Sequence, residues 1–182
     1  MKIDSKLNIV IPYQTEDDKT VYFHSTPIRR ETFDFYFMPI SMCFAELFTK
    51  GLSYVAGPRI AKLMLKRVAE EIGQWEGDSG VNNGLLGEVH RLTNVVLPTA
   101  NGWKNIPMVD AIKQGLVDEE SLDEIEGKLV FFMVSYAMHD KNTRASMVTT
   151  AGRLWGFHAT SLSCTEYRDS LQTSIQEEPT VS

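Results

Sequence analysis

The residues that could do chemistry are a histidine and an aspartate side by side, His139 and Asp140, which follow a strongly apolar stretch. Two such ligands at a helix end could hold a divalent metal ion, which would lower the pKa of a bound water. A complete site would also need an upstream histidine, for which His90 is the candidate, and a later aspartate, for which Asp169 is the choice. These four residues define one candidate site for metal-dependent hydrolysis.

Adjacent His-Asp pairs of this kind occur in metal-dependent phosphohydrolases of the HD type, and the resemblance is confined to the dipeptide. The four histidines fall on separate predicted elements, and none has a second histidine or a cysteine at metal-ligand spacing. The simpler interpretation of each is a surface or hydrogen-bonded side chain. Because the sequence also has no nucleophile elbow, Walker loop or dinucleotide-binding glycine motif, we expect no catalytic residue, no metal and no cofactor, with the phosphohydrolase as the alternative hypothesis.

The stretch from Asp118 to His139 is the most informative part of the chain. Its acidic first half, 118–126, suits the first turns of a helix, where the helix dipole favours negative charge and Asp118 can cap the end. Its second half is apolar on every face. A helix of that kind must be enclosed by other elements or by a partner.

Adjacent aromatic residues also imply that a second surface, in this chain or in a partner, must cover some of them, because neighbours on one helix cannot all face the same side. This surplus of apolar faces is the only feature that points outward to a partner. A basic helical face could in addition meet an acidic partner surface. The candidate partner-binding residues are therefore Phe35, Tyr36, Phe131, Phe132, Arg59, Lys62 and Lys66.

The remaining elements follow from hydrophobic periodicity and turn residues. Two β-branched and aromatic runs predict an N-terminal β-hairpin at about residues 7–25. Predicted helices cover 30–48 (with a kink or break at Pro39), 58–72, 85–96, 107–114, 118–139 and 145–157, and a last one contains Tyr167, Leu171 and Ile175. The connector 99–107 is predicted to be irregular.

These elements predict a mainly α fold, a helical bundle with a short N-terminal β-hairpin. We expect a single helical domain over residues 1–175 and a flexible C-terminal tail over 176–182. Cys43 and Cys164 are far apart and are expected to be free, buried thiols of a reducing cytoplasm.

Composition narrows the classes of partner. The formal net charge of -6 argues against nucleic acid as an obligatory partner. The most apolar segment is about half as long as a membrane span requires, and the N-terminus lacks the apolar run of a signal peptide. We therefore expect a soluble, intracellular protein with no membrane or nucleic-acid partner.

Several segments carry a resemblance to a known family. They are TVYFHSTPIRRETFDFYFMPISMCFAELF, GLSYVAGPRIAKLMLKRVAEEIGQW, GLLGEVHRLTNVV, GWKNIPMVDAIKQGLVDEESLDEIE and LVFFMVSYAMH, which together span roughly residues 7–139. In their content and order they resemble the tail assembly chaperones of tailed phages (siphophages).

The resemblance implies a mostly helical, non-enzymatic protein that binds the phage tape measure protein and recruits tail-tube subunits, the major tail protein. It implies action in the host cytoplasm, absence from the mature virion and a possible homo-oligomer. A phage structural or regulatory helical protein with another partner is the further alternative.

Overall fold

The protein, described here as a computed structural model over residues 7–176, contains a five-stranded antiparallel sheet. Its strands are β1 (Asn8–Gln14), β2 (Thr20–Ser25), β3 (Thr93–Thr99), β4 (Gly102–Pro107) and β5 (His158–Thr160), in the order β4-β3-β2-β1-β5. β1 pairs with all of β2 from Ile9 to Gln14, with Ile11 opposite Phe23. The predicted N-terminal hairpin is therefore confirmed, but it is the centre of a larger sheet.

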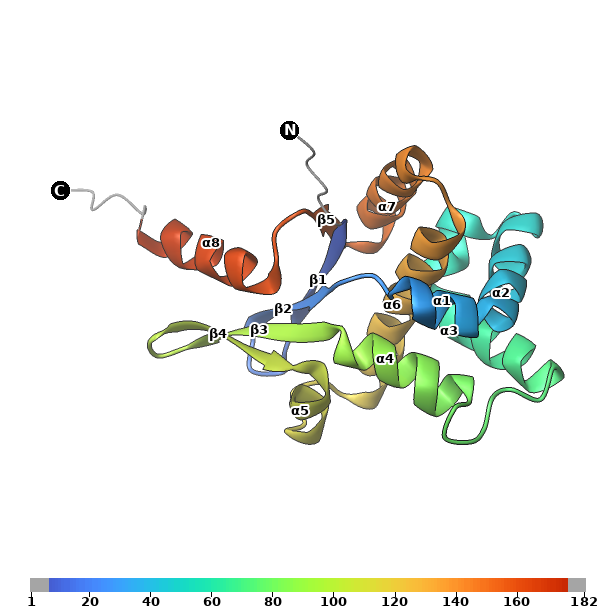
Figure 1. Ribbon diagram of the computed structural model, residues 1–182. Coiled ribbons are helices and arrows are strands. Elements are labelled where there is room, and N and C mark those ends of the chain that lie inside the picture. Colours follow the sequence, from blue (N-terminus) through green and yellow to red (C-terminus); the bar gives the residue numbers. More distant parts are fainter. Residues whose placement is uncertain (1–6, 177–182) are drawn as a thin grey trace.

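Helices pack on this sheet and on one another (Figure 1). They are α1 (Arg30–Phe35), α2 (Phe37–Thr49), α3 (Ser53–Glu71), the π-helix η1 (Val81–Leu85), α4 (Leu86–Arg91), α5 (Met108–Lys113), α6 (Glu119–Met138), α7 (Lys141–Trp155) and α8 (Cys164–Gln176). Figure 1 shows α6 between the sheet on one side and α2 and α3 on the other. The predicted tail 176–182 lies outside the described residues, apart from Gln176 at the end of α8.

The prediction of a helical bundle with a short hairpin was wrong, because the fold is α+β. Residues 93–96, predicted as the end of a helix, belong instead to β3, which pairs with both β2 and β4. The segment 102–107, predicted as part of an irregular connector, is β4. Val95 and Val96 are consecutive and both fully buried, which suits a strand whose two faces are both covered.

Two prolines also sit differently from the prediction. The helix is interrupted at Tyr36, between α1 and α2, and not at Pro39. Pro39 lies in the first turn of α2, where a missing N–H is tolerated. α3 begins at Ser53, so Pro58 lies inside that helix rather than at its start.

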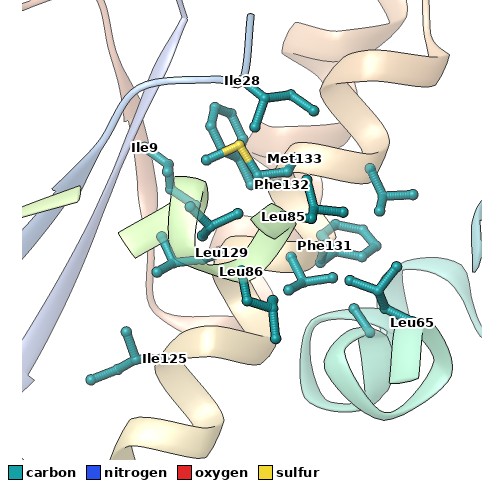
Figure 2. Close-up of a cluster of buried hydrophobic side chains, with 14 of the residues drawn as sticks. Ile9, Ile28, Leu65, Leu85, Leu86, Ile125, Leu129, Phe131, Phe132 and Met133 are labelled. Atoms are coloured by element: carbon teal, nitrogen blue, oxygen red, sulfur yellow. The ribbon is translucent and has the colours of Figure 1, made fainter. Parts of the chain in front are cut away.

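α6 is the element around which the main core forms. Asp118 caps it by accepting a hydrogen bond from the Ser121 N–H at 2.9 Å, as predicted. Ile125 and the residues from Leu129 to Val134 are all buried. In Figure 2, Leu129 lies toward Ile9 of β1, whereas Phe131 lies toward Leu65 of α3. The apolar faces of α6 are thus enclosed within this chain.

The opposite face of the sheet carries a smaller second core under α8. Tyr167 of α8 packs on Val10 and Val96. The loop before α8 is held by its Leu162 carbonyl, which accepts hydrogen bonds from Asn8 Nδ2 at 2.8 Å and His24 Nε2 at 2.9 Å. The predicted last helix is therefore present, and it packs on the sheet.

Within residues 7–176, none of the helices combines the length and the apolar character that crossing a membrane would require.

The closest helix–helix contact is between α3 and α6, and it depends on two glycines. A Cβ at Gly57 would lie 2.5 Å from the Phe131 ring, and a Cβ at Gly127 would lie 2.6 Å from the Pro58 carbonyl oxygen. The second contact is with backbone, which cannot turn aside as a flexible side chain can. The two helices therefore cannot keep this distance with a larger residue at position 127.

We expect Gly127→Ala to lower the free energy of unfolding by roughly 1–3 kcal/mol, because overpacking at the α3–α6 contact forces the backbones apart. Urea denaturation followed by circular dichroism measures the change. Gly87→Ala on α4 is the matched control, because a Cβ there meets nothing within 4 Å, and we expect it to be neutral or slightly stabilising. Equal stability of Gly127→Ala and wild type would contradict the constraint.

Candidate partner-binding groove

The four residues of the metal hypothesis do not come together. His90 donates from Nε2 to Glu126 Oε1 at 2.6 Å. Asp140 caps α7 by accepting from the Asn142 and Thr143 N–H groups, and Asp169 pairs with Arg168 on α8. Over residues 7–176, no group of three or more His, Cys, Asp or Glu side chains is placed to hold a metal ion. The convergence on which the phosphohydrolase alternative depends is not found.

His139 has a packing role instead. Its ring centroid lies 4.9 Å from that of Phe44 and 5.4 Å from that of Phe48. Its Nδ1 is 3.0 Å from the Ser135 carbonyl oxygen, one turn back on α6. The side chain therefore closes the C-terminal end of α6 against α2.

The predicted basic face of α3 is largely neutralised within the chain. Lys62 is half-buried and pairs with both Glu126 and Asp123. Lys66 lies 3.8 Å from Glu70 and sits over the Trp75 ring. Arg59 is exposed and lines a separate depression between α3, α6 and α7. Of the three predicted basic contacts, only Arg59 is both exposed and without a described ion pair.

Glu126 is the buried member of this network, with 6% of its surface exposed. Burial alone would raise the pKa of its carboxyl group. The hydrogen bonds and positive charge supplied by His90 and Lys62 outweigh burial, and the pKa is lowered from its usual 4.5. The network thus ties α3, α4 and α6 together around an ionised glutamate.

The prediction that Phe131 and Phe132 contact a partner at the surface was wrong. The two side chains are 1% and 0% exposed. They face different sides of α6, as predicted for adjacent aromatics, but the second surface they find is another part of the same chain. Neither can meet a partner without unfolding of the core.

Phe35 lies at the surface, as the partner-binding hypothesis requires, with 68% of its area exposed. Phe37 and Met38, in the first turn of α2, are 46% and 53% exposed. Nothing in the residue types distinguishes these two from the buried apolar residues. These three exposed apolar residues lie close in sequence at the junction of α1 and α2, and we refer to them as the apolar patch.

A groove beside this patch has a volume of about 510 Å³, within the range of ligand pockets, roughly 300–1,000 Å³. One wall is Phe35 and the other is the loop that connects α3 to η1. We call it the Phe35 groove. Its lining residues are Phe35, Tyr36, Gly73, Gln74, Glu76, Gly77, Ser79 and Gly80.

Tyr36 holds the two walls of the Phe35 groove together. Its ring is buried and packs edge-on against Phe35 at 4.8 Å between centroids. Its hydroxyl donates to the Ser79 carbonyl oxygen at 3.1 Å, and burial raises the pKa of that hydroxyl, which keeps it a donor. Tyr36 was predicted as a partner contact, but its position makes it a support for the groove.

The π-helix η1 provides the space for this hydroxyl. A Cβ at Gly84 would lie 1.8 Å from the Tyr36 oxygen, so only glycine fits. π-helical turns are rare and often occur at functional sites. The sequence signal for this region is the set of glycines at 73, 77, 80 and 84, between the predicted helices 58–72 and 85–96.

The Phe35 groove can bind apolar side chains, but its lining contains no histidine, cysteine, lysine or arginine. Glu76 is its single titratable acid. The groove therefore presents an exposed aromatic ring on one side and an exposed carboxylate on the other.

Comparisons with known proteins gave no relative: no family model, no curated protein and no solved structure matches the chain. The resemblance to tail assembly chaperones therefore stays a prediction from the sequence.

We expect Gly84→Ala to destabilise the protein by roughly 1–3 kcal/mol, because its methyl group collides with the Tyr36 hydroxyl. Tyr36→Phe alone removes one hydrogen bond and costs roughly 0.5–1.5 kcal/mol. In the double variant the hydroxyl that the methyl group would strike is gone. We therefore expect the double variant to lose less unfolding free energy than the two single variants lose together, by roughly 0.5 kcal/mol or more in urea denaturation. Strict additivity of the two losses would show that the two residues do not share this contact.

We expect Glu126→Gln to make the free energy of unfolding fall less steeply at acid pH than it does in the wild type. The folded-state pKa of Glu126 lies below the unfolded value of about 4.5, so its contribution is present above pH 4.5 and is lost as the pH falls through the folded pKa. At neutral pH the variant should be less stable by roughly 1–3 kcal/mol.

The measurement is urea denaturation at a series of pH values. Glu16→Gln, an exposed substitution in the β1–β2 loop, serves as control and should follow the wild-type curve. If Glu126→Gln also follows that curve below pH 4.5, the ionised state of Glu126 does not contribute to stability.

Proposed function

We propose that the protein is a non-catalytic tail assembly chaperone of a tailed phage, which binds the tape measure protein and recruits the major tail protein during tail assembly. The observation that carries the proposal is the exposure of Phe35, which lines the Phe35 groove. Phe37 and Met38, which follow it in the chain, are exposed as well. Exposed apolar patches beside a groove mark sites of protein–protein interaction. The sequence resemblance over residues 7–139 supports the particular partner.

The size of the patch fits a reversible chaperone. Phe35, Phe37 and Met38 are the large apolar side chains exposed at this junction, so a partner would meet a small number of apolar contacts there rather than a broad hydrophobic interface. Differences in affinity between related complexes arise mostly from dissociation rates, and a small patch allows fast dissociation. Tail-tube subunits could then displace the chaperone as the tube grows. Methionine at the rim suits varied partner side chains, because it is flexible and polarisable.

The proposal places the protein in the host cytoplasm and outside the mature virion. A chaperone of this kind would be abundant in infected cells and missing from purified particles. Mass spectrometry of both samples from the same phage tests this part of the proposal, and stoichiometric recovery of the chain in purified virions would overturn it.

Co-expression with the tape measure protein of the same phage tests the binding itself. We expect affinity purification of a tagged tape measure protein to recover this chain, and the soluble fraction of the tape measure protein to rise at least severalfold. Phe35→Ser should reduce the recovered chain about tenfold or more, because hot-spot aromatics carry on the order of 2 kcal/mol of binding energy.

The matched control is Leu154→Ser on α7, which removes an exposed apolar side chain that does not line the groove. It should leave recovery unchanged. Circular dichroism of each variant checks the fold. Equal recovery of wild type and Phe35→Ser would overturn the assignment of the Phe35 groove, and failure to recover the wild-type chain would overturn the chaperone proposal.

A further inference from the structure

The charge around the Phe35 groove is negative. Glu76 is an exposed lining residue, and Asp78 is exposed in the same loop. Over residues 7–176 neither side chain forms an ion pair with a lysine or arginine. The nearest basic residues at the end of α3, Lys66 and Arg67, are paired with Glu70 and Glu71 one turn further on.

The groove also offers an aromatic surface beside these carboxylates. Phe35 is largely exposed, and an exposed ring face attracts a lysine or arginine side chain that packs over it. An apolar patch with unpaired carboxylates at its edge therefore complements a segment that carries basic side chains next to apolar ones.

The local backbone favours a helical partner over an extended one. The walls of the groove are the α1–α2 junction and the 73–80 loop, and no strand of the sheet lines it. Addition of a strand requires a free sheet edge, which this groove does not supply. An amphipathic helix needs only a place for its anchoring side chains.

We infer that the Phe35 groove selects basic amphipathic helices, in which lysine or arginine lies one turn from the leucine or phenylalanine anchors. The inference deepens the proposed function on which it rests, because it states the chemistry of the segment that is bound. Exposed carboxylates contribute modestly to affinity and more to the rate of encounter.

Two synthetic helical peptides test the inference. They share the same length and the same leucine and phenylalanine positions, and differ in carrying lysine or glutamate beside those anchors. By fluorescence anisotropy at low salt, we expect the lysine peptide to bind wild type about three- to tenfold more tightly than the glutamate peptide. Raising the salt from roughly 0.05 M to about 0.5 M should shrink that difference, because exposed charges are screened.

Glu76→Lys should abolish or reverse the preference. Glu16→Lys changes the net charge of the protein by the same amount, but at the β1–β2 loop away from the groove, and should retain the preference. This control separates a local effect from the general attraction of an acidic protein for a basic peptide.

Phe35→Ser distinguishes the inference from the proposed function. If both peptides bind equally well and Phe35→Ser weakens both, the groove binds helices but the charge inference is overturned. If Glu16→Lys and Glu76→Lys change the preference equally, the inference is also overturned. If neither peptide binds wild type, the groove itself, and with it the structural basis of the proposed function, is overturned.

Discussion

The close contact between α3 and α6 is the constraint on which the rest of the structure depends. The second half of α6 is apolar on every face, so it can exist in water only if it is surrounded. The two helices approach closely because Gly57 and Gly127 leave room for the Phe131 ring and the Pro58 carbonyl. The same approach brings Lys62 to Glu126, which pairs a buried charge that would otherwise be costly. The sheet then covers the remaining face of α6, so the apolar residues from Leu129 to Val134 are buried within the chain.

The position of the candidate site follows from that arrangement. α2 packs on α3, and α3 leads directly into the loop that forms one wall of the Phe35 groove. The other wall is the break between α1 and α2, where Tyr36 turns into the interior and bonds to Ser79. Because the π-helical turn at Gly84 makes space for Tyr36, the groove is fixed at both sides by packed elements. A partner would therefore meet a largely preformed surface, which lowers the entropic cost of binding.

The sequence predicted those parts of the fold that depend on local pattern. The cap at Asp118 and the enclosed helix that follows it were readable from residue types alone, as was the β1–β2 hairpin. β3 and β4 were not, because Leu85, Val89, Leu92 and Val96 recur at helical spacing across a segment that changes from helix to strand near Leu92. What decides the change is the pairing of β3 with β2, whose residues lie far away in the sequence. A short strand covered on both faces has no alternating pattern to distinguish it from a buried helix.

The candidate site was predictable only in part, and for a related reason. The residue types indicate many aromatic side chains, but which of them remain exposed is decided by tertiary packing. Phe131 and Phe35 have the same side chain and similar apolar neighbours in sequence, yet one fills the gap opposite Gly57 and the other lies in solvent. Amino-acid composition does not distinguish a buried phenylalanine from an exposed one. The arrangement of α3 and α6 encloses Phe131 and Phe132, whereas Phe35, Phe37 and Met38 stay exposed where the helix breaks at Tyr36. Other apolar side chains, among them Val55, Leu63 and Leu154, are also exposed. The exposure at the junction of α1 and α2 follows from the helix break at Tyr36. Its side chain turns into the interior and donates a hydrogen bond to Ser79, whereas the residues on either side of it, Phe35 and Phe37, are left at the surface.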